Sequence, residues 1–235
     1  SAPAGITVAA NDQNAENARS IGTLRVGRLE LHVADQAFLF GDGPTVLNTV
    51  TVGEAAGAAG LVPGRVIRLR LPDGFVGNWD EGASVSVGGV AAEKIGQPIS
   101  YDGSAVRLVV TSAFSESDSF TLDGLSVESF AAPMGAASLA LSANEEGTVN
   151  SESEGMLRVG KLSLQGASQS FLVGDPISPV STVTITESTQ AAGLVAGRSL
   201  RLQLPVGFAG SWSTEETVDV GGGAAGKLTV QSIAE

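Results

Sequence analysis

Four carboxylates occur at matched positions in two similar stretches of the sequence and are candidate calcium ligands. Asp42 and Asp175 follow the runs FLFG and FLVG, and Glu54 and Glu187 end the runs TVTVGE and TVTITE. Calcium prefers oxygen ligands of this kind. Neither stretch has the dense D-x-D-x-D-G spacing of a dedicated calcium loop, and short acidic side chains also stabilise turns. The sequence therefore leaves two interpretations open, a calcium site or a set of turns.

Two acidic and amide-rich runs are further candidates for metal binding. ANDQNAEN occupies 10–17, and SANEEGTVNSESE occupies 142–154. Such polar runs are typical of exposed loops or linkers. Their carboxylate and amide oxygens also give them some capacity for calcium. The sequence predicts no other cofactor.

The remaining residue types predict no catalytic site. His32 is the single histidine, and Gln165 stands at the matched position of the second stretch, so no nucleophile–histidine pair recurs. The chain has no cysteine, which excludes disulfides and Cys-ligated zinc. Catalytic carboxylates need distinct environments, whereas these lie in repeated turns or variable loops. We expect that the protein is not an enzyme.

Aromatic and arginine residues recur between the two stretches. Trp79 and Trp212 could stack on sugar rings, or they could fill core positions near Phe75 and Phe208. The recurring arginines are expected on solvent-facing strand positions, where they could pair with acids or set the register of a subunit interface. These arginines are Arg65, Arg68, Arg198 and Arg201.

The two stretches belong to one internal repeat. Residues 21–95 align with 154–228 without a gap at a constant offset of 133 residues, and about 39 of the 75 positions are identical. The beginning of the sequence repeats as well, since SAPAG at 1–5 resembles AAPMG at 131–135. The chain is therefore predicted to consist of tandem modules.

Composition and patterning predict that these modules are all-β. Hydrophobic residues make up 43% of the 235 residues, which is enough to bury a core. The 31 glycines, with many Thr, Ser and Val, favour strands joined by tight turns. Alternating runs at 65–71, 84–88, 105–111 and 119–130 predict short strands. Strands at such spacing are typical of an antiparallel β-sandwich.

Two motifs carry a resemblance to a known kind of module. RLRLPDGF at 68–75 ends a strand in LP-x-G-F, and GGVAAEK at 88–94 forms a GG-x-A-A-x-K turn. With the rest of the repeat, they resemble the tandem immunoglobulin-like modules of bacterial and archaeal surface proteins, of the S-layer, filament or adhesin type. The resemblance implies an immunoglobulin-like sandwich and brings no catalytic residues with it.

We therefore predict two tandem immunoglobulin-like sandwiches. The second is truncated or completed by a neighbouring subunit, because it lacks a counterpart of 104–130. The predicted segments are an N-terminal segment or donor strand at 1–36, the first sandwich at 37–131, an inter-repeat segment at 132–169 and the incomplete second sandwich at 170–235.

Net charge narrows the classes of partner. A formal charge of −12 argues against nucleic acid and against anionic lipid. No apolar run reaches the roughly 18 residues of a membrane span. We predict a secreted, cell-surface structural subunit that assembles with copies of itself into a filament, sheath or surface layer, by strand complementation between copies. The alternative is an adhesin or carbohydrate-binding repeat whose partners are surface glycans.

Overall fold

The chain forms two compact units in a computed structural model. The first unit comprises Ser1–Ser163 with Thr186–Val195, and the second comprises Leu164–Ile185 with Ala196–Glu235. Among the described residues, no helix has both the length and the apolar character needed to cross a membrane. The structure describes residues 4–8, 18–24, 26–57, 59–143, 148–189 and 191–231.

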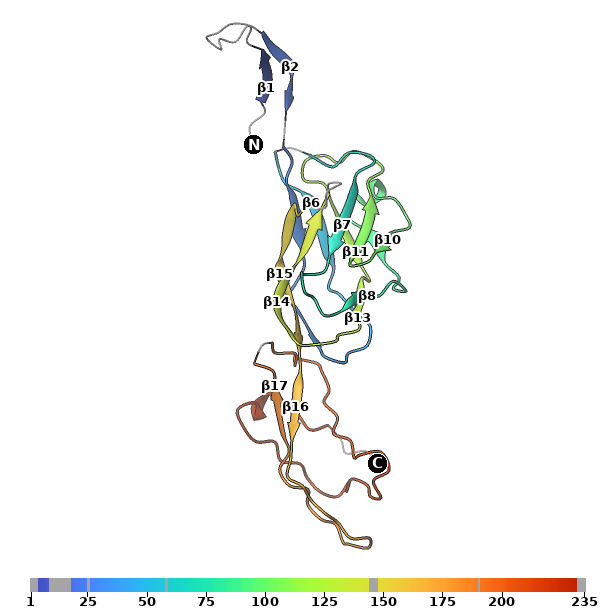
Figure 1. Cartoon of the computed structure of the whole chain (residues 1–235), viewed down its shortest axis with the longest axis vertical. Coiled ribbons are helices and arrows are strands. Elements are labelled where there is room, and N and C mark those ends of the chain that lie inside the picture. Colours follow the sequence, from blue (N-terminus) through green and yellow to red (C-terminus); the bar gives the residue numbers. More distant parts are fainter. Residues whose placement is uncertain are drawn as a thin grey trace. The chain divides into compact units, whose positions relative to one another are not determined.

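The first unit contains an antiparallel β-sandwich (Figure 1), which confirms the predicted fold class. Its larger sheet has six strands in the order β10-β11-β7-β14-β15-β4, and only the pair of β15 and β4 is parallel. The strands are β4 (Gln36–Leu39), β7 (Val66–Arg70), β10 (Ser100–Asp102), β11 (Ala105–Val109), β14 (Met134–Ser142) and β15 (Ser151–Gly160).

A four-stranded antiparallel sheet has the order β3-β6-β12-β9, and a small sheet has the order β5-β13-β8. The four strands are β3 (Leu29–His32), β6 (Val50–Glu54), β12 (Ser119–Asp123) and β9 (Ser86–Gly88). The three short strands are β5 (Thr45–Val46), β13 (Ser126–Glu128) and β8 (Asn78–Trp79). The 3₁₀ turn η1 spans Ala92–Lys94.

Strand β7 shows how the alternating sequence builds the core. Ile67 and Leu69 are fully buried, whereas Arg68, which lies between them, and Arg70, which follows, are half-buried. Leu108 of β11 lies opposite Ile67. Successive side chains of a strand point to opposite faces of its sheet, so one face of β7 joins the core. Burial of each large apolar side chain stabilises the fold by about 1.5–3 kcal/mol.

An aromatic group forms part of this core. The ring of Phe38 stacks on that of Phe130 with centroids 4.8 Å apart, and Phe75 meets both rings edge-on. Trp79 is only 3% exposed, and its Nε1 donates a hydrogen bond of 2.8 Å to the carbonyl of Ser104. Trp79 and Phe75 therefore have the core role that the sequence predicts for them.

The hairpin of β14 and β15 is an integral part of the sandwich, because it lies between β7 and β4 in the larger sheet. The predicted first sandwich at 37–131 stops before this hairpin, which falls in the segment predicted at 132–169. At the matching place before the first repeat, β1 (Ala4–Val8) and β2 (Ala18–Leu24) form another antiparallel hairpin.

The second repeat has few regular elements among its described residues. They are β16 (Leu162–Gln165), β17 (Thr184–Glu187) and the 3₁₀ turn η2 (Ala225–Lys227), with β16 and β17 in a two-stranded sheet (Figure 1). Each matches an element of the first repeat, namely β3, β6 and η1. The counterparts of β4 and β7, at 169–172 and 199–203, are irregular.

Candidate functional site

A buried glutamate fixes the loop that follows β6. Glu54 is almost fully buried, and its Oε1 accepts hydrogen bonds from the amides of Gly60, at 2.7 Å, and Leu61, at 2.5 Å. A carboxylate strengthens such bonds because it carries a full charge. The loop is thereby held in one conformation by the last residue of the strand that precedes it.

The same arrangement recurs in the second repeat. Glu187 Oε1 accepts from the amide of Gly193 at 2.8 Å and from that of Leu194 at 2.6 Å. The two loops also share the sequence AAGLV, at 58–62 and 191–195. Their backbone contacts are therefore set by the local sequence.

The loop of the second repeat packs against the first sandwich through backbone alone. A Cβ added to Gly193 would overlap Leu39 Cδ2 and would lie 2.9 Å from the carbonyl oxygen of Phe38. A Cβ added to Gly160, the last residue of β15, would lie 2.5 Å from the amide nitrogen of Gly193 and 2.7 Å from its Cα. Real Cβ atoms do not approach this closely, so both positions require glycine.

Polar and charged contacts surround this glycine pair. Arg158 Nε donates a 3.0 Å hydrogen bond to the carbonyl of Ala192. The amide of Phe40 donates to the carbonyl of Gly160 at 2.7 Å, and Lys161 Nζ lies 5.0 Å from the centroid of the Phe40 ring. All these residues belong to the first unit as the structure divides the chain. Together they form a packed contact between a loop of the second repeat and the sandwich of the first.

The matched place in the first repeat is open by comparison. A Cβ added to Gly60 would lie 3.5 Å from Gly27 Cα and 3.9 Å from both carboxylate oxygens of Glu54, with no Phe–Leu pair against it among the described residues. The loop of the first repeat thus has the same local structure as the 191–195 loop. Among the described residues, it has no partner equivalent to Phe38 and Leu39.

The four calcium candidates act as hydrogen-bond acceptors in turns. Besides the two glutamates, Asp42 Oδ2 accepts from the amide of Leu39 at 2.8 Å, and Asp175 Oδ2 accepts from that of Leu172 at 2.7 Å. No three His, Cys, Asp or Glu residues gather into a possible metal site in the part of the chain that the structure describes. The geometry matches the turn interpretation. The run at 10–17 lies outside the described residues, as do residues 144–147 of the second run.

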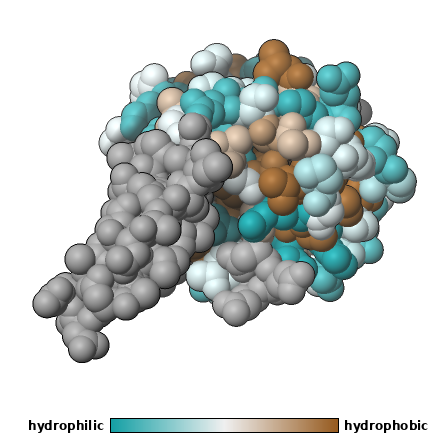
Figure 2. Space-filling view, turned by 90° about the horizontal axis from the view of Figure 1, so that it is seen from above, coloured by the Kyte–Doolittle hydropathy of each residue, from teal (hydrophilic) through white to brown (hydrophobic). Residues whose placement is uncertain are grey.

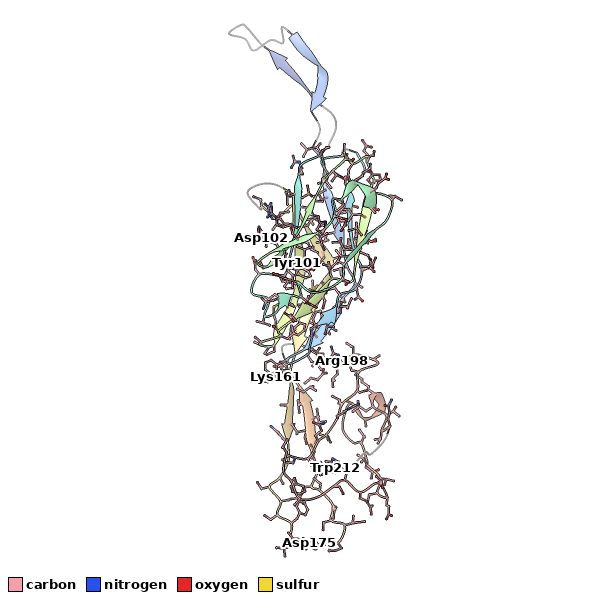
Figure 3. The ribbon with its side chains drawn as sticks, turned by 90° about the vertical axis from the view of Figure 1, so that its right-hand side faces the viewer. Tyr101, Asp102, Lys161, Asp175, Arg198 and Trp212 are labelled. Carbon is pink, nitrogen blue, oxygen red and sulfur yellow. The ribbon has the colours of Figure 1, made fainter. Side chains whose placement is uncertain are left out.

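The other candidates do not gather around this contact. His32 is half exposed, with Nε2 and Nδ1 each 3.9 Å from a carboxylate oxygen, of Glu30 and Glu154 respectively. Burial excludes sugar stacking on Trp79. Trp212 is half-buried and lies with Asp175 on irregular segments of the second unit (Figure 3).

The recurring arginines differ from one another in burial and in hydrogen bonding. Arg65 Nη1 donates a 2.9 Å hydrogen bond to the carbonyl of Ala143. Arg68 and Arg198 are half-buried, and Arg201 is exposed. Their role in the register of a subunit interface stays a prediction.

Sequence reasoning missed the glycines of this contact, because it searched for side chains that carry chemistry. The signal was present, since LRVG occurs at 24–27 and 157–160 and AAGLV occurs twice. Glycine identity within a repeat indicates a position where the backbone must approach another chain segment closely.

Comparison with known proteins gives one structural likeness and no sequence match. No family model matches the sequence, and neither does any curated protein. Among solved structures, the chain is similar to a non-cellulosomal cohesin from the hyperthermophilic archaeon Archaeoglobus fulgidus, with 11% sequence identity and a TM-score of 0.28. The match covers 56% of this chain and 91% of that chain. The fold described above rests on the strands and their pairing.

Proposed function

We propose that this protein is a non-catalytic structural subunit that assembles with copies of itself into a filament, sheath or surface layer at the cell surface. The contact of the 191–195 loop with Phe38, Leu39 and Gly160 carries the proposal. In this contact, the surface of the first β-sandwich receives a loop of the second repeat.

The contact joins two different surfaces, which supports growth into an array. One surface is the glycine loop after β6 or β17, and the other is the end of β4 with Gly160 of β15. An interface between unlike surfaces leaves one of each free, so it propagates unless rotation closes it into a ring. Repeated modules therefore favour a linear or sheet-like assembly over a closed dimer.

The order of elements along the chain supports the same proposal. The β14–β15 hairpin belongs to the larger sheet of the sandwich, and only Lys161 separates the end of β15 from β16 in the second repeat. The β1–β2 hairpin stands before β3 in the same way. One strand thus completes a module and leads directly into the next one, which joins successive modules through short covalent connections.

The extracellular location is part of the proposal and rests on composition and resemblance. The cysteine-free, acidic sequence and its likeness to surface-array modules support it. The proposal needs no cofactor, because the carboxylates that were calcium candidates are engaged by backbone amides. Its partners are copies of the chain, with no role for nucleic acid or membrane insertion.

Negative-stain electron microscopy of the purified chain at several concentrations, with and without a calcium chelator, tests the proposal. We expect ordered filaments or sheets that persist in chelator. Single particles at every concentration would contradict self-assembly. Loss of order on chelation would instead assign the acidic residues to a calcium-dependent contact.

A further inference from the structure

Two apolar residues at matched positions differ sharply in burial. Val159 of β15 is 0% exposed and lies opposite Phe38 of β4, whereas its counterpart Val26 is 75% exposed. Both stand in the same LRVG sequence. Because the residue type is unchanged, the difference comes from what covers it: Val159 has the β4 strand beside it, and Val26 has no such strand among the described residues.

Val26 belongs to a surface of the first repeat that matches one side of the internal contact. We call Val26, Gly27 and Gly60 the head surface. Glu54 already holds its loop in the conformation that the 191–195 loop adopts in its contact. The head surface is therefore preformed, and its glycine leaves room for a partner backbone.

The second repeat exposes the matching other side. Phe171 and Leu172, the counterparts of Phe38 and Leu39, are 39% and 78% exposed, and we call them the tail surface. Asp175 holds the turn after them as Asp42 does in the first repeat, through the amide of Leu172. Apolar residues at a preformed turn are a typical docking position for another chain.

We propose that the head surface of one copy of this chain docks on the tail surface of a second copy and repeats the internal contact. This inference rests on the proposed function and names the surfaces through which it operates. The occupant is a second copy because the chain itself carries both halves of a contact that it already makes once. In the face that Figure 2 views, hydrophobic residues are exposed among hydrophilic ones.

The internal contact also fixes the register between copies. Gly160 lies opposite Leu39, and the carbonyl of Gly160 accepts from the amide of Phe40. Between copies, Val26 is then opposite Phe171 and Gly27 is opposite Leu172. The carbonyl of Gly27 accepts from the amide of Val173, and Gly60 lies against Leu172. Val26 and Gly27 of one copy, which follow β2, thereby pair in parallel with residues 171–172 of the other.

Gly60→Ala separates the effect on docking from the effect on folding. Within one chain the new methyl group meets only atoms at 3.5 Å or beyond, which is ordinary van der Waals contact. In the docked state it would overlap the partner's leucine, as a Cβ on Gly193 overlaps Leu39. The matched control is Gly43→Ala, whose added Cβ has open space around it. Sedimentation velocity of the full chain is expected to show at least about tenfold weaker self-association for Gly60→Ala and wild-type association for Gly43→Ala.

Leu172→Asp tests the tail surface in the same assay. A buried, unpaired carboxylate opposes docking, and Val206→Asp, at another exposed apolar position, is the control. Leu172→Asp alone and Gly60→Ala alone are each expected to be mainly monomeric. Mixed together they are expected to form dimers that stop at two, because one intact head and one intact tail remain.

The outcomes separate this inference from the proposed function. If the wild-type chain assembles but Gly60→Ala and Leu172→Asp assemble equally well, the head-to-tail contact is wrong and self-assembly stands. If the wild-type chain stays monomeric at every concentration, both fail. If the mixture forms no dimer, the two surfaces do not pair with each other and the inference is overturned.

Discussion

The two repeats share about half of their aligned residues, yet among the residues that the structure describes only the first repeat forms part of a sandwich. Their turns are alike in detail: Gln36 Oε1 accepts from the amide of Asn48 at 2.8 Å, and Gln169 Oε1 accepts from that of Ser181 at 2.6 Å. The edge-on pair of Phe38 and Phe75 also recurs, as Phe171 and Phe208 with centroids 6.1 Å apart. Contacts whose two partners both lie within the repeated stretch are therefore reproduced in the second copy.

The two repeats differ in their pairing with strands that lie outside the repeated stretch. Strand β7 pairs with β11 and with β14, and both partners come from the part of the chain between the two copies. Its counterpart at 199–203 keeps the apolar alternation, with Leu200 and Leu202, but no strand pairs with it among the described residues. A strand needs neighbours and a covered face to be stable. The comparison shows that the repeat sequence determines turns, whereas the sandwich depends on strands outside the repeated stretch.

The largest expected difference between the repeats is at a matched pair of leucines. Leu69 is 0% exposed and Leu202 is 45% exposed. Leu69→Ala is expected to lower the free energy of unfolding by about 2–5 kcal/mol because it leaves a cavity in the core. Leu202→Ala is expected to change it by less than about 0.5 kcal/mol. Urea unfolding of dilute protein measures both changes in free energy. Equal losses for the two variants would contradict the difference in burial between the repeats.

The tryptophans should show a smaller difference. Trp79→Phe removes the donor to the Ser104 carbonyl, which is expected to cost about 1–3 kcal/mol. Trp212→Phe, at the half-buried matched position, is expected to cost about 0.5 kcal/mol or less. Each variant leaves a single tryptophan, so its fluorescence should report a buried ring for Trp79 and a more solvated one for Trp212. A solvated emission from Trp79 would contradict its core position.

The smallest expected difference is electrostatic and depends on pH. Lys94 Nζ lies 2.6 Å from Asp118 Oδ2, and this side-chain hydrogen bond, with one from the amide of Ser115, lowers the pKa of Asp118. A lowered folded-state pKa means that the stabilisation is present above the unfolded pKa and is lost as the pH falls through the folded value. Lys94→Met is therefore expected to lower the melting temperature at neutral pH.

Two controls sharpen this electrostatic test. The melting temperatures of the wild type and Lys94→Met are expected to converge in strongly acidic solution, where Asp118 is protonated in both. Lys227→Met, at the exposed matched position of the second repeat, is expected to leave the melting temperature unchanged at either pH. Lys94 Nζ also lies 5.7 Å from the centroid of the Phe114 ring. A difference that is constant across pH would show that Lys94 acts through this contact rather than through Asp118.

Much of the fold was predictable from local patterns. The alternating residues of β7, the run at 105–111 and the turn glycines all predict an antiparallel sandwich, which the structure confirms. The place of the β14–β15 hairpin was not predictable, because nothing in its sequence states that it pairs with β7 and β4. Strand partners far apart in sequence are chosen by packing, and a single sequence does not record that choice.

The candidate site was predictable only in part. The recurrence of Glu54 and Glu187 marked the correct loops, but carboxylate chemistry suggested calcium, whereas these oxygens accept bonds from backbone amides. The close approach of Gly160 and Gly193 depends on the absence of side chains. Only the three-dimensional structure shows which backbone segment fills the space that a side chain would take.

Hydrogen exchange of two matched segments tests the central claim most directly. Dilute protein would be labelled and the exchange of residues 66–70 compared with that of 199–203. We predict strong protection of 66–70, near-unprotected exchange of 199–203, and a gain of protection at 171–173 as the concentration rises and a second copy docks. Equal, strong protection of both segments in dilute solution would contradict it, because the second repeat would then fold without a partner.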